Sequence, residues 1–458
     1  MSADSLARPS PAPVALSLKR NFCWTLAGNV IYAGCQWGML VVLAKLGNPE
    51  MVGQFSLGLA ITAPIIMFAN LQLRAIQATD ARDEYRFGDY LGLRLITTVL
   101  ALLVIAGVSL GCGYPASTAG IIVVIGLAKA FETLSDVIYG LLQRHERMDR
   151  IAISMSIKGP LSLIALGVGV YMTRDVLWGA AGMAMAWLGL LLTYDVRSGI
   201  FVQKALARQR AAGIDAVSAE DRRALLHEAT LRPYWDTPTL RRLAWISLPL
   251  GIVMMLISLQ VNIPRYFVAR YCGVHDLGIF SALAYLQAAG ITVVGALGQS
   301  AVPRLARYRA DQRAAAFRGL LYRLLGIGLG LGTGGVLVAI VAGRPLLTLL
   351  YRPEYAEQVH VFIWIMVGAG IGYVSAFLGY AMTAARYFVC QLPLFIVTTT
   401  TTAAACYLLV PSYCLVGAAC ATVIATTVSL VGSAVIVAHA MRAQRQGPRT
   451  GSTPAASV

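Results

Sequence analysis

Charged residues are scarce in this chain of 458 residues. Asp, Glu, Lys and Arg make up 13% of it, whereas a soluble globular chain contains about 25%. Hydrophobic residues reach 58%, and the mean hydropathy is +0.69. A composition this apolar excludes a disordered or collagen-like chain, and it does not suit three ordinary soluble domains. The sequence therefore predicts an integral membrane protein.

The chain also lacks the usual signatures of metal and cofactor chemistry. None of its eight cysteines forms a Cys-x-x-Cys pair, and its five histidines form no zinc-type pattern with them. We expect most cysteines to be small packing residues, and we expect no catalytic residue, metal or cofactor. A Gly-x-Gly-x-x-Gly match at Gly330, Gly332 and Gly335 lies within an apolar run and not after a strand, so it predicts close helix packing or helix bending and not dinucleotide binding.

Positive charge is in excess, with 37 Lys and Arg against 21 Asp and Glu and a net charge of +16. Such an excess occurs in nucleic-acid-binding proteins. Here, however, most basic residues stand in short segments between apolar runs, which is the pattern that the positive-inside rule describes. The distribution argues against a nucleic-acid partner and for contact with membrane lipids.

Twelve apolar runs are long enough to cross about 30 Å of hydrocarbon. They cover residues 21–46, 51–73, 91–112, 117–142, 151–173, 176–201, 243–268, 277–303, 319–342, 356–384, 388–410 and 414–441. The runs are continuous and do not alternate as barrel strands do, so only helices suit them. The predicted fold is an all-helical bundle.

The basic residues also predict the orientation of the bundle. One side of the twelve-helix map collects 29 Lys and Arg and the other side six, with Lys129 and Lys158 left inside helices. The positive-inside rule then places both termini in the cytoplasm. All loops on the outer side are short, which leaves no room for an external catalytic domain.

A hydrophilic, basic segment divides the chain six plus six. We expect flexible cytoplasmic tails at 1–20 and 442–458, an N-terminal lobe at 21–201, a basic cytoplasmic linker at 202–242, and a C-terminal lobe at 243–441. At a constant offset of 225, residues 44–59 match residues 269–284 at Ala44/Ala269, Gly53/Gly278, Phe55/Phe280 and Ser56/Ser281. The match predicts two parallel lobes related by a pseudo-two-fold axis, with a central cavity between them.

Ionisable residues within the apolar runs are the first candidates for a substrate path. Lys129, Glu132 and Asp136 lie on one helical face at spacings of three and four. Lys158, on the next helix, lies at the depth of Asp136, so we expect an Asp136–Lys158 pair and a deeper Lys129–Glu132 pair. Two interpretations stay open: the pairs only neutralise each other, or they line or gate a cavity for a charged, polar substrate.

Amides and arginines in the other runs extend the list of candidate substrate-binding residues. They are Asn29, Gln36, Asn70, Gln72 and Arg74 in the first half, and Gln260, Asn262 and Arg265 in the second. Such amides suit sugar hydroxyls, although they also serve as ordinary interhelical hydrogen bonds.

Three segments carry a resemblance to a known family. They are GQFSLGLAITAPIIMFANLQLRAIQATDARDEYRFGDYLGLRL at 53–95, YGLLQRHERMDRIAISMSIKGPLSLIALG at 139–167, and LGYAMTAARYFVCQLPL at 378–394. They resemble the oligosaccharide flippases of O-antigen type, the polysaccharide-transporter branch of the multidrug/oligosaccharidyl-lipid/polysaccharide flippase superfamily. The resemblance implies alternating-access movement of an undecaprenyl-diphosphate-linked oligosaccharide from the cytoplasmic to the periplasmic leaflet, for lipopolysaccharide or exopolysaccharide synthesis.

The resemblance also implies a cationic cavity for the diphosphate, for which Arg74, Lys129 and Arg265 are the candidates. Glu132 and Asp136 are candidates for binding a coupling H⁺ or Na⁺. Partners implied by such a pathway are glycosyltransferases or a polymerase. Two alternatives remain: a cation-coupled multidrug exporter of the same superfamily, and a membrane-embedded polysaccharide polymerase or ligase.

Overall fold

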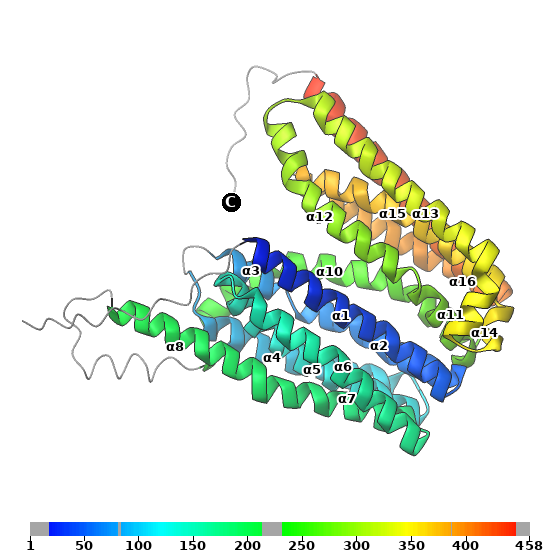
Figure 1. Ribbon diagram of the computed structural model, residues 1–458, viewed down its shortest axis with the longest axis horizontal. Coiled ribbons are helices and arrows are strands. Elements are labelled where there is room, and N and C mark those ends of the chain that lie inside the picture. The colour runs from blue at the N-terminus through cyan, green and yellow to red at the C-terminus, as the bar shows by residue number, and fades with distance from the viewer. Residues whose placement is uncertain (1–17, 81–83, 213–230, 386, 446–458) are drawn as a thin grey trace, which may run out of the picture. The chain divides into compact units, whose positions relative to one another are not determined.

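The computed structural model describes residues 18–80, 84–212, 231–385 and 387–445. Within these ranges the chain is helical and contains no strand, which confirms the predicted all-α class (Figure 1). The helices are α1 (Leu18–Leu46), α2 (Pro49–Ala69), α3 (Leu73–Thr79), α4 (Phe87–Gly111), α5 (Ala116–Arg144), α6 (Met148–Thr173), α7 (Val176–Leu190), the π-helix η1 (Leu191–Asp195), α8 (Val196–Ala212), α10 (Thr237–Tyr271), α11 (Val274–Tyr285), α12 (Ala288–Ala310), α13 (Ala314–Leu350), α14 (Pro353–Glu357), α15 (Val359–Ala384) and α16 (Phe388–Arg445).

The helices follow the predicted apolar runs closely. Ten helical stretches of the described chain are long and apolar enough to cross a membrane. One of them, within α16, is broken at Cys414 and so forms two limbs. Helix α5 has 29 residues and is not among the ten. Adding α5 and the second limb of α16 gives the twelve crossings that the sequence predicts.

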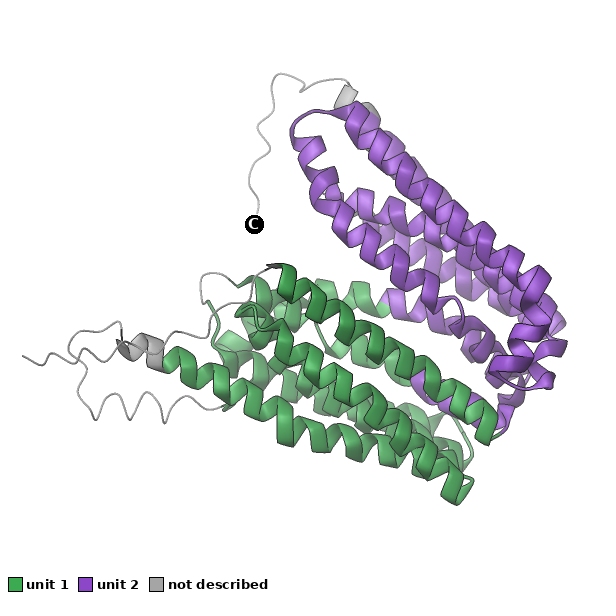
Figure 2. Ribbon diagram, viewed as in Figure 1, with its two compact units in different colours: residues 1–47, 61–255 green, residues 48–60, 256–458 purple. Residues whose placement is uncertain are grey.

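The described residues form two compact units (Figure 2). Unit 1 contains Met1–Gly47 and Ile61–Met255, and unit 2 contains Asn48–Ala60 and Leu256–Val458. The start of α2 therefore packs with the second half of the sequence, and α10 changes unit near its middle. The predicted tails lie mostly outside the described residues, as do residues 213–230 of the predicted linker.

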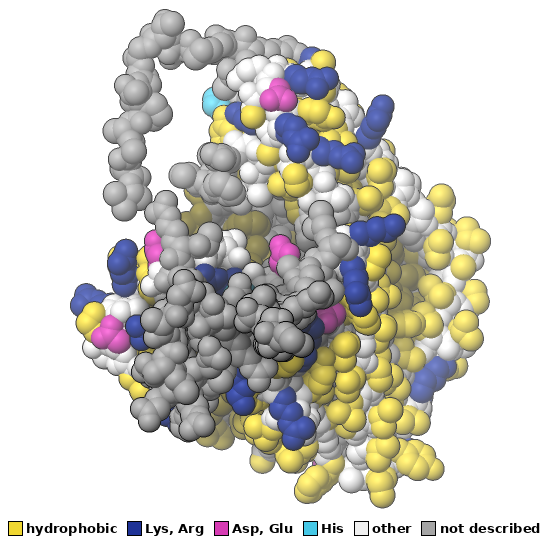
Figure 3. All heavy atoms as spheres, turned by 60° about the vertical axis from the view of Figure 1, so that its left-hand side comes forward, with side chains coloured by type: hydrophobic (Ala, Val, Ile, Leu, Met, Phe, Trp, Pro, Cys, Tyr) yellow, Lys and Arg dark blue, Asp and Glu magenta, His cyan; other side chains and the backbone are white. Residues whose placement is uncertain are grey.

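Hydrophobic side chains cover much of the surface of the described residues. Figure 3 shows broad areas of them, with Lys and Arg side chains between. Large apolar side chains remain exposed along the helices, for example Leu103 at 63% and Val341 at 81%. Such exposure suits contact with lipid tails, where no water has to be excluded.

Small residues bring the helices of each unit together. In unit 1, a Cβ atom on Gly28 of α1 would stand 2.8 Å from the Cα atom of Ala152 on α6. In unit 2, a Cβ atom on Gly332 of α13 would stand 2.5 Å from the Cα atom of Gly370 on α15. Helices approach this closely only where side chains are absent. Within the predicted glycine run, Gly332 is thus a point of close packing, whereas Gly330 and Gly334 have no atom within 4 Å of an added Cβ.

The repeat found in the sequence has a direct structural counterpart in unit 2. A Cβ atom on Gly53 would lie 1.9 Å from the carbonyl oxygen of Val274, and one on Gly278 would lie 1.8 Å from that of Pro49. At the offset of 225, Gly53 corresponds to Gly278 and Pro49 to Val274. The contact is therefore reciprocal, as a two-fold axis passing between the starts of α2 and α11 requires.

Alanine at either of these two glycines is expected to destabilise the protein strongly. The added methyl group would overlap a helix backbone, which cannot rotate away as a side chain can, so the cost is at or above the usual 1–3 kcal/mol or so for overpacking. Gly278→Ala and Gly53→Ala should each lower the unfolding temperature in detergent. Gly330→Ala, which has no atom within 4 Å of its added Cβ, is the matched control; equal melting of all three variants would contradict the packing argument.

A carboxylate outside the membrane-spanning segments holds the turn between α3 and α4. Asp80 accepts hydrogen bonds from the backbone N–H groups of Glu84 at 3.1 Å and Tyr85 at 3.2 Å, and Arg144 lies 3.9 Å away. Burial alone would raise the pKa of Asp80, but these hydrogen bonds and the arginine lower it below its ordinary value of 3.8. The ionised form is thus the one that the fold stabilises.

The lowered pKa of Asp80 sets the sign of a pH effect. Stability from this carboxylate is fully present above its ordinary pKa and is lost as the pH falls through the lower pKa of the folded state. Asp80→Asn should therefore lower the unfolding temperature near neutral pH, and the difference from wild type should shrink below pH 3.8. Parallel melting curves for the two proteins across that range would contradict this role.

Candidate functional site

Unit 1 contains a cluster in which two arginines share one carboxylate. Asp136 of α5 lies 3.2 Å from Arg74 of α3 and 3.4 Å from Arg94 of α4. The side chain of Arg94 is 1% exposed, and that of Arg74 is 32% exposed. Asn70 also accepts a hydrogen bond from Arg94. Two guanidinium groups and one carboxylate give this cluster a net charge of +1.

The predicted Asp136–Lys158 pair is therefore wrong. Asp136 is held by arginines from α3 and α4, and Lys158 lies beside Asp195. Arg74 approaches because the chain turns sharply at Leu71 and Gln72, whose φ angles are 48° and 52°. This turn ends α2 and starts the short helix α3, which carries Arg74 back to α5.

The predicted Lys129–Glu132 pair is confirmed. The Nζ atom of Lys129 lies 2.8 Å from Oε2 of Glu132, and the hydroxyl group of Tyr32 donates to Oε1 at 2.5 Å. Lys129 also lies 5.1 Å from the ring centroid of Trp187, within cation–π range. Helices α1, α5 and α7 thus meet at this pair, and its side chains are 21% and 28% exposed.

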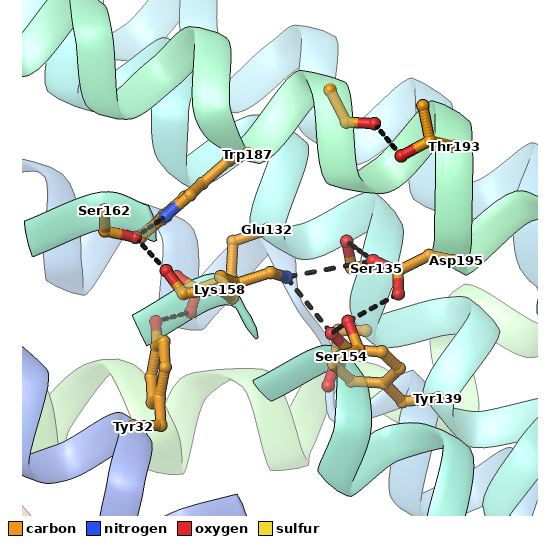
Figure 4. A network of polar contacts seen from close by, with 12 residues as sticks. Tyr32, Glu132, Ser135, Tyr139, Ser154, Lys158, Ser162, Trp187, Thr193 and Asp195 are labelled. Atoms are coloured by element: carbon orange, nitrogen blue, oxygen red, sulfur yellow. Dashed lines mark hydrogen bonds and ion pairs between the residues drawn. The ribbon is translucent and has the colours of Figure 1, made fainter. Parts of the chain in front are cut away.

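Lys158 belongs to a second, fully buried network (Figure 4). Its Nζ atom lies 3.9 Å from Asp195, and the two side chains are 2% and 1% exposed. Asp195 accepts hydrogen bonds from Ser135 at 2.7 Å and Ser154 at 2.6 Å. Lys158 donates to the hydroxyl group of Tyr139 at 3.2 Å. Buried charges persist only when paired and hydrogen-bonded in this way.

The π-helix η1 carries Asp195 to this network. A π-turn widens the helix by one residue, and such turns occur mostly at functional positions. Here the turn ends at Asp195 and continues into α8. The aspartate side chain consequently faces α5 and α6, which supply Ser135, Ser154 and Lys158 (Figure 4).

Tyr139 contacts both the Arg74–Asp136 cluster and the Lys158–Asp195 network of unit 1. Its ring centroid lies 5.6 Å from the guanidinium carbon of Arg74 and 5.2 Å from Nζ of Lys158. Its hydroxyl group pairs with that of Ser154 at 2.7 Å. The face of α5 that the sequence singled out is therefore polar and contacts other helices of unit 1.

Arg265 is the main candidate in unit 2, and its surroundings differ from those of the unit 1 cations. It is half-buried in α10, and its Nη1 atom donates to the side-chain oxygen of Asn262 at 3.0 Å and to the carbonyl group of Val261 at 3.1 Å. Among the residues that the structure describes, it has no salt bridge to a carboxylate. A guanidinium group with only neutral partners attracts anions.

The remaining predicted amides have varied surroundings. Asn262 also donates to the carbonyl group of Ser258 at 2.9 Å, and Gln260 accepts from Thr398 at 3.4 Å. Gln36 has a buried Nε2 atom without a hydrogen-bond partner in the structure. Asn29 is exposed, and Gln72 stands in the turn before α3. These amides do not gather into one cluster within either unit.

Sequence reasoning missed two of the most buried charges, Arg94 and Asp195. Arg94 lies inside the run at 91–112, and the structure buries its side chain completely. Asp195 lies inside the run at 176–201. The rule that an ionisable residue in an apolar run marks a candidate site applies to both and would have found them.

Comparison with known proteins identifies the family. The profile of a family described as "Polysaccharide biosynthesis protein" matches residues 18–309. The chain belongs to this family. A curated relative, capsular polysaccharide biosynthesis protein CapF of Staphylococcus aureus, is 27% identical over 414 residues, which cover 90% of this chain and 97% of CapF.

Two solved structures have a fold similar to that of this chain. An inward-facing multidrug resistance MATE family transporter of the MOP superfamily aligns with a TM-score of 0.71 and 12% identity, over 93% of this chain and 99% of that one. The lipid II flippase MurJ aligns with a TM-score of 0.63 and 10% identity, over 93% and 90%. The chain is thus a multi-pass membrane protein of the polysaccharide biosynthesis family, and its fold is similar to that of these two transporters.

Proposed function

We propose that this protein moves a polyprenyl-diphosphate-linked oligosaccharide from the cytoplasmic to the outer leaflet of the bacterial inner membrane. The observation that carries the proposal is Arg265, a cation within a spanning helix whose contacts are neutral groups. A diphosphate is the anionic part of such a lipid, and arginine binds phosphate oxygens through several N–H groups at once. In unit 1, the excess charge of Arg74 and Arg94 over Asp136 supports the same choice of substrate.

The physical task explains why charge and amides are needed inside an apolar protein. Each sugar hydroxyl that enters hydrocarbon without a hydrogen bond costs on the order of a few kcal/mol. Amides such as Gln260 and Asn262 would replace water around such hydroxyls. The polyprenyl tail needs no such path, because it remains in lipid throughout.

The membrane potential supplies a driving force for this direction. Moving one negative charge outward across a membrane that is positive outside releases about 2.3 kcal/mol per 100 mV. A diphosphate with about two charges would release about 4–5 kcal/mol. Glu132 and Asp136 already accept ion pairs from Lys and Arg, so we propose the potential as the main driving force and H⁺ or Na⁺ coupling as an addition. Transport that is unchanged after the potential and both gradients collapse would contradict this coupling.

The proposed substrate is tested by the lipids of cells that lack this protein. Diphosphate-linked oligosaccharide should accumulate while surface polysaccharide is lost, and mass analysis of the extracted lipid would identify the sugar. The glycosyltransferases and polymerase of that pathway are the partners we propose. Unchanged lipids and polymer, together with restored drug export on re-expression, would instead indicate the multidrug exporter, whose cationic substrates would not need Arg265.

A further inference from the structure

Two of the eight cysteines are brought together at one end of unit 2. Cys272 follows α10 directly, and Cys414 forms the break in α16. Their side chains form a disulfide bond, with Cα atoms 5.9 Å apart across 142 residues of sequence. This Cα separation is within the range that disulfides need. Five other cysteines of the described chain, including Cys112, are free thiols.

The predicted topology places this pair on the outer side of the membrane. Helix α10 starts after the basic linker, on the cytoplasmic side, so its end at Cys272 is outside. The first limb of α16 also starts on the cytoplasmic side and reaches the outer side at Cys414. Thiols there meet an oxidising environment, whereas cytoplasmic thiols stay reduced.

We propose that Cys272 and Cys414 are an oxidative modification site, at which a disulfide formed in the outer compartment fastens the α10–α11 corner to the break in α16. This inference does not depend on the proposed substrate. The oxidant is a protein disulfide of that compartment. One cysteine thiolate attacks it to form a mixed disulfide, and the second thiolate then displaces the oxidant. The oxidant leaves as a dithiol, which carries the two electrons and the two protons that the cysteine thiols have lost.

The carboxylate of Asp276 protects this disulfide against reduction. Its Oδ2 atom lies 3.4 Å from the Sγ atom of Cys414. Attack by an external thiolate on Cys272 expels Cys414 as a thiolate beside that carboxylate, and attack on Cys414 brings the incoming thiolate beside it. Like charges at this distance raise the energy of both routes. Asp276 should therefore slow reduction of the bond.

The bond supports the reciprocal contact described above. Val274, whose carbonyl oxygen faces Gly53, is two residues beyond Cys272. The intervening Gly273 has a φ angle of 92°, so the corner turns sharply between the disulfide and the contact. Fastening Cys272 to α16 restricts movement of this corner, and thereby holds the start of α11 against α2.

Alkylation of the wild-type protein tests the proposal without any variant. An iodoacetamide pulse on protein purified without reductant should modify Cys112 at once, because that side chain is exposed. Cys272 and Cys414 should be modified only after reduction, and digestion before reduction should give their linked peptide. Immediate alkylation of both would overturn the proposal. The three groups Cys272, Asp276 and Cys414 lie within 4.8 Å of one another, so zinc retained together with free thiols would overturn it in favour of a metal site.

Intact cells and one variant complete the test. A membrane-impermeant maleimide should label Cys112 in intact cells and should label Cys272 only after an external reductant is added. Labelling that requires permeabilised cells would place the corner inside and overturn the proposal. Asp276→Asn should be reduced severalfold faster by dithiothreitol than wild type, and Cys112→Ser at the wild-type rate. Equal rates of reduction for Asp276→Asn and wild type would show that the carboxylate does not protect the disulfide.

Discussion

Replacement of Arg265 by alanine is expected to slow export of the lipid-linked oligosaccharide by about tenfold to a hundredfold. Hydrogen bonds to charged groups contribute about 1.5–3 kcal/mol, so loss of the guanidinium should weaken diphosphate binding about tenfold to a hundredfold. The residue's contacts are to neutral groups on its own helix, so removing it leaves no buried carboxylate without a partner. Flipping in proteoliposomes, normalised to the amount of folded protein, is the measurement.

Two substitutions distinguish direct binding of the diphosphate by Arg265 from a general effect of positive charge. Arg265→Lys keeps the positive charge but loses the planar set of donors, so it should retain only part of the activity. Arg270→Ala removes an exposed arginine from the end of the same helix and should leave flipping close to wild type. If Arg265→Ala flips the lipid at the wild-type rate, Arg265 does not bind the headgroup and the proposed function loses its main support.

The spanning helices were predictable because a bilayer imposes one length on all of them. Twelve apolar runs gave twelve crossings, and most boundaries agree within a few residues. The exceptions arise from local backbone geometry. The turn at Leu71 and Gln72 requires φ angles of 48° and 52°. Neither Leu nor Gln favours positive φ angles, so these residue types do not predict the turn. The break at Cys414, in contrast, lies where the predicted runs 388–410 and 414–441 adjoin, so the sequence did indicate it.

The pairing of buried charges was predictable only within one helix. Lys129 and Glu132 are three residues apart on α5, and helical geometry alone brings them together. Asp136 and Lys158 lie on different helices, where depth can be estimated but the rotation of each helix cannot. The true partners come from the short helix α3, from α4 and from η1. None of those positions follows from hydropathy.

Loss of one partner from the Lys158–Asp195 pair is expected to have the largest effect on stability. Both side chains are almost fully buried, and removing one charge from such a pair typically costs about 3–5 kcal/mol, because the other charge stays buried alone. Lys158→Met and Asp195→Asn should each lower the unfolding temperature and the yield of folded protein. Their combination should recover most of the loss, since neither charge then remains. Thermal unfolding in detergent measures the three variants.

The double variant also separates the two interpretations of the buried network. If Lys158 and Asp195 only neutralise each other, restored stability in the double variant should bring restored flipping. If they line the substrate path or gate it, the double variant should fold well and still flip slowly. The reason is that the charged groups now hydrogen-bonded to Ser154 and Tyr139 would be missing from the path. Lys129→Met provides the comparison, since its pair with Glu132 is partly exposed and its removal should destabilise the protein less. A double variant as unstable as either single variant would contradict the pairing itself.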